Sequence, residues 1–156
     1  MQSRMKSPVM IVPQVMESLQ DLGKALFASA EKNNVPARTL FLCYLRASQI
    51  NGDSVCVELH SKNAIAAGET ETRLFAVAAW RETPYFNEAE RAVLALSEAA
   101  TRINDRINPV PDEVYNEATK HYTEEGLATL ITGIATVNLW NRLNVPTKQI
   151  VRIPEE

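Results

Sequence analysis

Apolar residues recur along most of the chain with the spacing of amphipathic helices. Alanine and leucine supply many of these positions, and only five of the 156 residues are glycine. We find no convincing run of alternating apolar and polar residues that would mark a β-strand. The pattern therefore predicts an all-α fold. Seven helices are expected, at Met16–Asn33, Val35–Ile50, Asp53–Ala67, Thr70–Arg81, Asn87–Arg102, Asp112–His121 and Thr123–Leu143.

Local signals support several of these boundaries. Pro36 suits the first turn of a helix, and Asn51-Gly52 is a typical helix end. Asn87-Glu88-Ala89-Glu90 has the spacing of a capping box. Segment 108–111 contains two prolines, and it is the expected linker between the fifth and sixth helices.

Length and pattern together predict one helical-bundle domain. A chain of 156 residues can bury a substantial core as a single unit. We expect this domain at residues 16–148, after an N-terminal extension (1–15) and before a polar C-terminal tail (149–156). The last predicted helix carries apolar positions that we expect to pack against a neighbouring subunit of a homo-oligomer, namely Leu127, Leu130, Ile131 and Ile134.

Composition excludes several classes of partner. The formal net charge is −3, and no basic stripe is present that could neutralise nucleic-acid phosphates. Two cysteines are too few for a disulfide scaffold. No apolar run approaches the roughly 20 residues that cross a bilayer, and the first residues make a poor signal peptide. We therefore expect a cytoplasmic protein with no membrane and no nucleic-acid partner.

The stretch NGDSVCVELH, residues 51–60, carries the most distinctive chemistry. On a helix, Asp53, Cys56 and His60 fall within about 60° of arc. Cys56 and His60 are i,i+4 neighbours whose side chains can touch. An imidazole beside a thiol can accept its proton, and the thiolate is the reactive form. The start of the helix also favours a thiolate.

Asp53 has the opposite effect on the same sulfur. A carboxylate at about 6 Å disfavours the thiolate by roughly 0.7 to 2.8 kcal/mol, for an effective dielectric between 80 and 20. Aspartate is also a favoured N-cap, so this residue has a structural explanation. Spacing alone therefore leaves open whether the stretch is a thiol site or a packed helix.

The remaining candidate residues have structural explanations. Cys43 lies within an apolar helix and is expected in the core, not in a disulfide with Cys56. His121 is expected at the surface, and Trp80 and Trp140 as core or interface anchors. The sequence contains no phosphate loop, no zinc-ligand spacing and no serine-hydrolase elbow. We therefore assign no metal and no cofactor.

Six ordered blocks of sequence occur between about position 35 and position 148, at Leu45–Gly52, Leu59–Lys62, Ala67–Glu69, Ala78–Pro84, Glu90–Ala92 and Asn138–Asn144. On these blocks the chain resembles the alkylhydroperoxidase D-like (AhpD-like) branch of the carboxymuconolactone decarboxylase superfamily. The resemblance implies an all-helical domain assembled as homotrimers or homohexamers, and a thiol peroxidase that reduces organic hydroperoxides.

The site of that family resembles Glu-(x)11-Cys-x-x-Cys-x-x-x-His. Its second cysteine attacks the peroxide, and its first cysteine then forms a disulfide with it, while the glutamate and histidine relay protons. The resemblance places the attacking cysteine at Cys56 and the histidine at His60. Asp53 stands at the position of the resolving cysteine, and Phe41 at that of the glutamate. Cys43 lies about 200° around the helix from Phe41 and should point away.

These departures leave three functions open. The first is a one-cysteine peroxidase in which Cys56 attacks, His60 is the acid/base and an external thiol is the reductant. The second is a non-redox helical oligomer, structural or binding a small molecule through Asp53 and His60. The third is a lactone decarboxylase or isomerase. The redox reading requires that Cys56 lose its proton easily.

Overall fold

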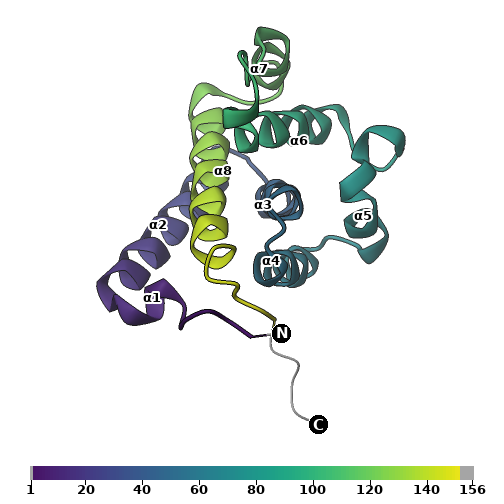
Figure 1. Cartoon of the computed structure of the whole chain (residues 1–156). Coiled ribbons are helices and arrows are strands. Elements are labelled where there is room, and N and C mark those ends of the chain that lie inside the picture. Colours follow the sequence, from purple (N-terminus) through teal and green to yellow (C-terminus); the bar gives the residue numbers. More distant parts are fainter. Residues whose placement is uncertain (1, 152–156) are drawn as a thin grey trace.

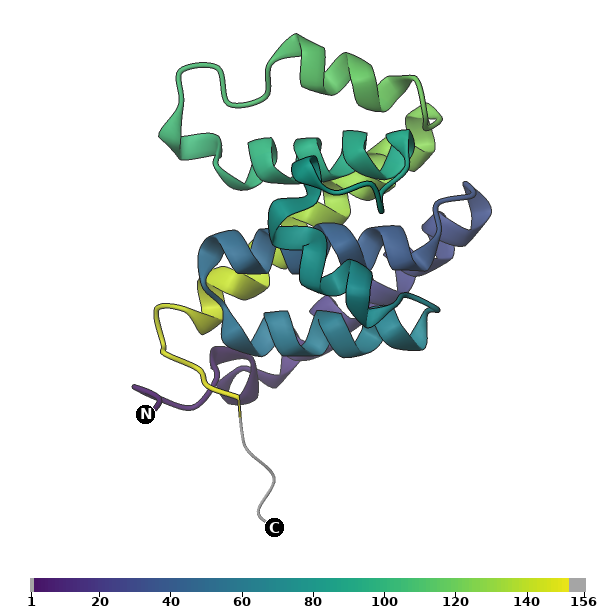
Figure 2. The ribbon, with the colours of Figure 1, turned by 90° about the vertical axis from the view of Figure 1, so that its right-hand side faces the viewer.

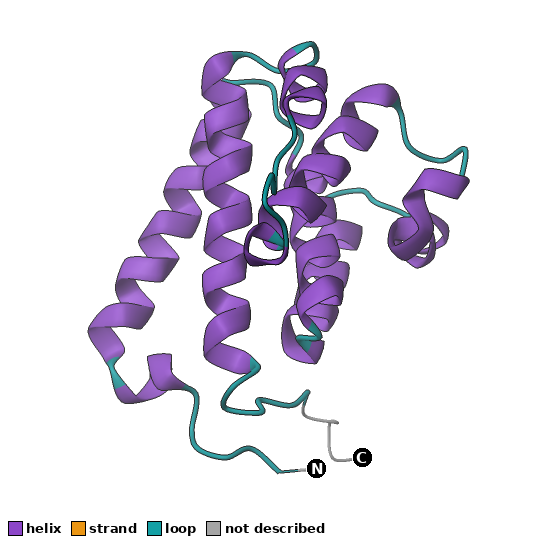
Figure 3. Cartoon of the chain, turned by 45° about the horizontal axis from the view of Figure 1, so that its top comes forward, coloured by secondary structure: helices purple, strands orange, loops and turns teal. Residues whose placement is uncertain are grey.

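The computed structural model describes residues 2–151, and within that range every regular element is a helix (Figure 3). This confirms the predicted all-α fold. None of these helices combines the length and the apolar character that a membrane span requires. The elements are α1 (Pro8–Ile11), α2 (Pro13–Lys32), α3 (Ala37–Asn51), α4 (Ser54–Ala66), α5 (Glu71–Ala76), η1 (Val77–Glu82), α6 (Glu88–Thr101), η2 (Ile103–Asp105), α7 (Asp112–Thr119) and α8 (Glu124–Asn144).

Helix α3 is the centre of the bundle. It packs against α4, α6 and α8, while α2 lies along α8 (Figure 1). The side view places α3 between α6 and α4 (Figure 2). Because α3 has neighbours on several sides, eight of its fifteen residues are buried. Its sequence is correspondingly apolar on more than one face.

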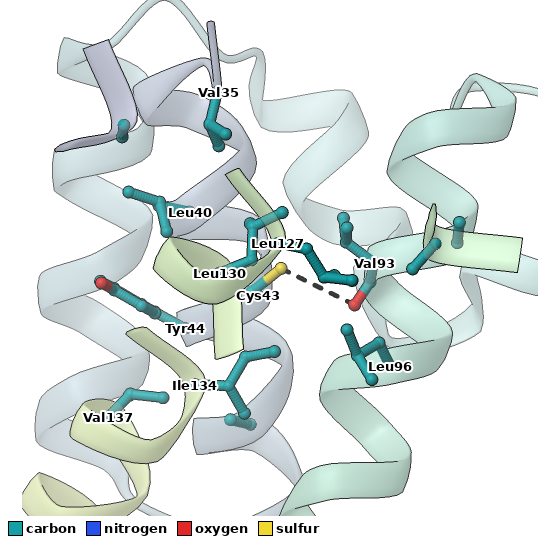
Figure 4. Packing of buried hydrophobic residues seen from close by; sticks show 14 residues of the cluster. Val35, Leu40, Cys43, Tyr44, Val93, Leu96, Leu127, Leu130, Ile134 and Val137 are labelled. Atoms are coloured by element: carbon teal, nitrogen blue, oxygen red, sulfur yellow. Dashed lines mark hydrogen bonds between the residues drawn. The ribbon is translucent and has the colours of Figure 1, made fainter. Parts of the chain in front are cut away.

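The core explains most of the apolar pattern of α8. Leu127, Leu130 and Ile134 pack with Cys43 and other buried residues of α3 and α6 (Figure 4). The prediction that these three α8 residues face a neighbouring subunit was wrong, because the chain's own helices cover them. Of that predicted set only Ile131 is exposed, at 39%. A homo-oligomer stays a prediction.

Most predicted boundaries agree with the structure to within a few residues, but the helix predicted at Thr70–Arg81 is interrupted. It divides into α5 and η1, and Ala79 has a non-helical backbone (φ −120°, ψ 32°). The interruption directly precedes Trp80, whose buried indole Nε1–H donates to Glu98 at 3.1 Å. The helix thus loses its regular geometry at Ala79, next to a tryptophan that contacts Glu98 of α6.

Of the predicted N-terminal extension, residues 2–15 lie within the described range and are part of the folded structure. The extension contains α1 and the first turn of α2, which begins at Pro13 instead of Met16. The backbone N–H of Arg4 donates to the carbonyl of Thr147 at 2.9 Å. The two terminal segments therefore lie side by side below the bundle (Figure 1).

Candidate active site

Asp53 forms the junction between α3 and α4. Gly52 ends α3 with a φ of 69°, in the left-handed region that favours glycine. Asp53 follows as the N-cap of α4, and its Oδ1 accepts the backbone N–H of Cys56 at 3.1 Å. The predicted cap is confirmed. Only 2% of Asp53 is exposed, so its carboxylate lies inside the protein.

Two asparagines of α8 satisfy the other oxygen of this carboxylate. The Nδ2 atoms of Asn141 and Asn144 each donate to Oδ2 of Asp53 at 3.0 Å. Together with Asn138 they recur at intervals of three residues, which places them on one face of the helix. They were not among the predicted site residues. Amides repeated at this interval in a largely apolar helix were the signal that could have found them.

The amide network continues to α3. Asn141 also donates to Oγ of Ser48 at 3.1 Å. Asn51 donates to the Oδ1 atoms of Asn138 and Asn141, at 2.9 and 2.8 Å. Three helices thus contribute to one polar cluster, which forms only when they have packed. All of the side chains that donate to Asp53 in the described range are neutral amides.

Cys56 lies next to this cluster. It is 3% exposed, and its Sγ accepts a hydrogen bond from Asn144 Nδ2 at 3.5 Å. Burial raises the pKa of the Cys56 thiol to about 12, and the adjacent carboxylate of Asp53 adds to the increase, against the smaller opposing effect of Asn144 and Asn141. Burial and Asp53 thus oppose the easily lost proton that the redox reading requires. The sequence contained the carboxylate but not the extent of burial.

His60 is the other reactive group of α4. It is 9% exposed, and neither ring nitrogen has a hydrogen-bond partner among the described residues. The rings of Phe41 and Tyr44 flank it, with centroids at 6.4 and 5.2 Å. Burial lowers the pKa of His60 to about 4, although the charge of Asp53 partly opposes this. The imidazole is therefore neutral at pH 7, and the Phe41 ring packs beside it at the position where the family has a glutamate.

Cys56 and His60 line a common cavity of about 320 Å³, to which Asn144 also contributes. No hydrogen bond joins Cys56 to His60. The predicted pair therefore faces one cavity, but the thiol does not contact the imidazole directly. Trp140, which was expected as a core or interface anchor, is half-buried and lines this cavity. The other apolar side chains around it are Val9, Met10, Met16, Val55, Leu59 and Ile150.

The sequence of this scaffold matches a known family. A model of the carboxymuconolactone decarboxylase family matches residues 13–99, which is more than half of the chain. The chain belongs to this family. It is 34% identical over 135 residues to the uncharacterized protein YdfG of Bacillus subtilis, covering 86% of this chain and 88% of that protein. It is 31% identical over 107 residues to the uncharacterized protein YnjA of Escherichia coli, covering 65% and 56%.

Solved structures extend the likeness beyond residues 13–99. A crystal structure of an Agrobacterium tumefaciens protein of unknown function, suggested to be the antioxidant defence protein AhpD, superposes with a TM-score of 0.87. The two are 27% identical, over 97% of this chain and 99% of that one. The debrominase Bmp8 superposes with a TM-score of 0.80 at 21% identity, over 92% and 74%, which shows a shared fold.

As a carboxymuconolactone decarboxylase family protein of the AhpD-like type, this chain has an altered cysteine arrangement. Cys43 is wholly buried, and its thiol points to the carbonyl of Val93 at 3.8 Å (Figure 4). Both cysteines are free, and Cys43 lies in the core as predicted.

His121 is partly covered, and its Nε2 is 3.2 Å from Glu117. No group of metal-binding side chains occurs among residues 2–151.

Proposed function

We propose that this carboxymuconolactone decarboxylase family protein is a one-cysteine thiol peroxidase for small, apolar organic hydroperoxides. One observation carries the proposal. Cys56 and His60 line the same apolar cavity, and both ring nitrogens of this buried histidine lack a protein partner. Buried polar groups are nearly always hydrogen-bonded, so such a histidine has free bonding capacity for a ligand in the cavity. The antioxidant role suggested for the Agrobacterium protein is consistent with this.

In the first step, Sγ of Cys56 attacks the terminal oxygen of the hydroperoxide. The O–O bond breaks, and the thiol proton passes through His60 to the leaving oxygen, so that an alcohol and a cysteine sulfenic acid form. Sulfur is oxidised by two electrons and the peroxide is reduced by two. The redox reading of the sequence required an easily lost proton, which the Cys56 thiol does not have. We therefore propose that proton transfer accompanies attack, and we expect slow turnover because the neutral imidazole is a weak base.

The second step uses an external thiol. That thiol attacks the sulfenic sulfur, water leaves, and a mixed disulfide forms on Cys56. A second external thiol then releases the reduced protein and leaves as a disulfide. An intramolecular disulfide is not available in this cycle, because Asp53 occupies the resolving position and Cys43 is enclosed in the core.

The test uses cumene hydroperoxide with dithiothreitol as the reductant. We expect slow consumption of the peroxide, and a dimedone adduct on the Cys56 peptide when dithiothreitol is omitted. The Cys56→Ser variant should lose both, while Cys43→Ala, the matched control, should keep them. Equal peroxide consumption by wild type and Cys56→Ser would disprove the proposal.

A second candidate is binding without redox turnover. It is favoured by the protonated state of Cys56, since a thiol with a pKa of about 12 is a poor nucleophile at pH 7. Cumyl alcohol, which has the shape of the hydroperoxide without its O–O bond, separates the two. If it raises the melting temperature in wild type and less in His60→Phe, while the peroxide is not consumed, the cavity is a binding site only.

A further inference from the structure

One side of the cavity comes from a segment that largely precedes the family match. Residues 7–16, which we term the N-terminal wall, contribute Val9, Met10 and Met16 to the lining. The family model begins only at position 13. Val9 is 3% exposed although it belongs to a helix of four residues. The wall is therefore packed against the molecule and is not a loose extension.

Directly before the wall, hydrogen bonds join the two chain termini. Arg4 donates from its backbone N–H to Thr147 and from Nη1 to the carbonyl of Pro146, both at 2.9 Å. Gln149 Nε2 donates to the carbonyl of Met5 at 3.0 Å. These side-chain hydrogen bonds are solvent-exposed. Exposed bonds of this kind open more readily than a packed core, so this side can move while the bundle stays folded.

The side chains of the wall and of the cavity limit which ligands can enter. Its two methionines are flexible, apolar side chains that adapt to ligands of different shape. The side chains that line the cavity include no lysine, arginine, aspartate or glutamate. A charged ligand would therefore lose its hydration without gaining an ion pair. Neutral ligands do not carry this cost.

We propose that the N-terminal wall determines the specificity of the thiol cavity, admitting neutral apolar molecules to Cys56 and excluding bulky ones unless it opens. The inference deepens the proposed function, but it requires only that Cys56 be the reacting group. Alkylation can therefore test it whether or not the protein consumes peroxide.

The experiment compares two neutral maleimides, N-ethylmaleimide and the bulky N-(1-pyrenyl)maleimide, at pH 9. Mass spectrometry measures the adduct on the Cys56 peptide, and an adduct on the buried Cys43 reports unfolding. Arg4→Ala removes a side-chain anchor and should raise the rate with the pyrenyl reagent at least fivefold, with less than a twofold change for the small one. Met10→Trp should lower the pyrenyl rate at least fivefold.

Lys6→Ala is the matched control, because it removes a positive charge from the same segment without removing an anchor. It should leave the ratio of the two rates unchanged. Iodoacetamide and iodoacetate then test charge at equal size, and the neutral reagent should modify Cys56 at least ten times faster. A bulky-to-small ratio that stays within twofold in Arg4→Ala and Met10→Trp would overturn the inference, as would equal rates for the two iodo reagents.

Discussion

Two buried carboxylates, Glu98 and Asp53, are stabilised in different ways. Glu98 accepts from Arg46 Nε at 2.6 Å, from Arg81 Nη1 at 2.5 Å and from the indole N–H of Trp80 at 3.1 Å. Burial disfavours its charged form, but these hydrogen bonds hold the pKa of Glu98 below its usual value. Asp53 accepts only from uncharged N–H groups, those of two asparagines and a backbone amide.

The difference decides what each carboxylate does to its surroundings. Two guanidinium groups compensate Glu98, and that of Arg81 also lies 4.1 Å from the Trp80 ring centroid. This ion cluster ties α3, η1 and α6 together. No cation pairs with the carboxylate of Asp53 among residues 2–151, so its charge acts on the titratable groups beside it, Cys56 and His60. We therefore expect Glu98 to govern stability and Asp53 to govern reactivity.

The largest effect is expected from Glu98→Ala. The side chain of Arg46 is 13% exposed, so its charge would remain mostly buried without a partner. Removal of one member of a buried ion pair costs about 3 kcal/mol or more. The urea midpoint should fall accordingly with an unchanged m-value. Glu117→Ala, which breaks an exposed pair, should shift the midpoint far less, and equal shifts would show that burial of the pair has no energetic consequence.

The second effect is a loss of stability in acid that depends on His60. Its folded-state pKa of about 4 lies below its ordinary value of 6.5. The unfolded chain therefore binds the proton first, so this contribution is complete above pH 6.5 and is lost as the pH falls toward 4. The loss amounts to about 3 kcal/mol. Urea titrations between pH 7 and 4 should show it in wild type and in His121→Gln, but not in His60→Phe.

Asp53→Asn should change reactivity more than any other single substitution in the cluster. Without the negative charge, the pKa of Cys56 moves down from about 12, and each unit increases the thiolate fraction about tenfold. Iodoacetamide should then modify Cys56 about ten times faster at pH 8. The side-chain N–H₂ of the new asparagine would face groups that donated to the Asp53 carboxylate. The free energy of unfolding should therefore also fall by about 1–2 kcal/mol. Glu98→Gln removes a charge elsewhere and should leave the alkylation rate unchanged.

Asn144→Leu is expected to have the smallest effect. It removes the donor that contacts both Asp53 and the sulfur of Cys56. One lost hydrogen bond to sulfur, worth roughly 0.5–1 kcal/mol, should slow alkylation about threefold at pH 8. Asn138 contacts neither Asp53 nor the sulfur of Cys56, so Asn138→Leu serves as the control. A rate as fast as wild type in Asn144→Leu would mean that the contact at 3.5 Å does not support the thiolate.

Local sequence signals anticipated much of the fold and three residues of the candidate site, Asp53, Cys56 and His60. The capping box at Asn87 and Glu90 is formed in full, and Asp53 caps α4. Both depend on backbone N–H groups within three residues, which is why short-range pattern was sufficient. The interruption of the helix predicted at Thr70–Arg81 was not anticipated, and it accompanies a contact of Trp80 with Glu98, eighteen residues away. The amides of Asn141 and Asn144 were missed because their shared partner, Asp53, lies 88 and 91 residues earlier in the chain.

The sequence by itself determined the helices, the family, and the placement of Asp53, Cys56 and His60 on one side of α4, because helix geometry fixes neighbours three and four residues apart. Only the tertiary structure decided the chemistry of those groups. Proton affinity depends on how much water reaches a side chain and on which distant residues face it. Burial among α3, α8 and the N-terminal segment favours the protonated thiol of Cys56 and the neutral imidazole of His60, and no local pattern contains that information.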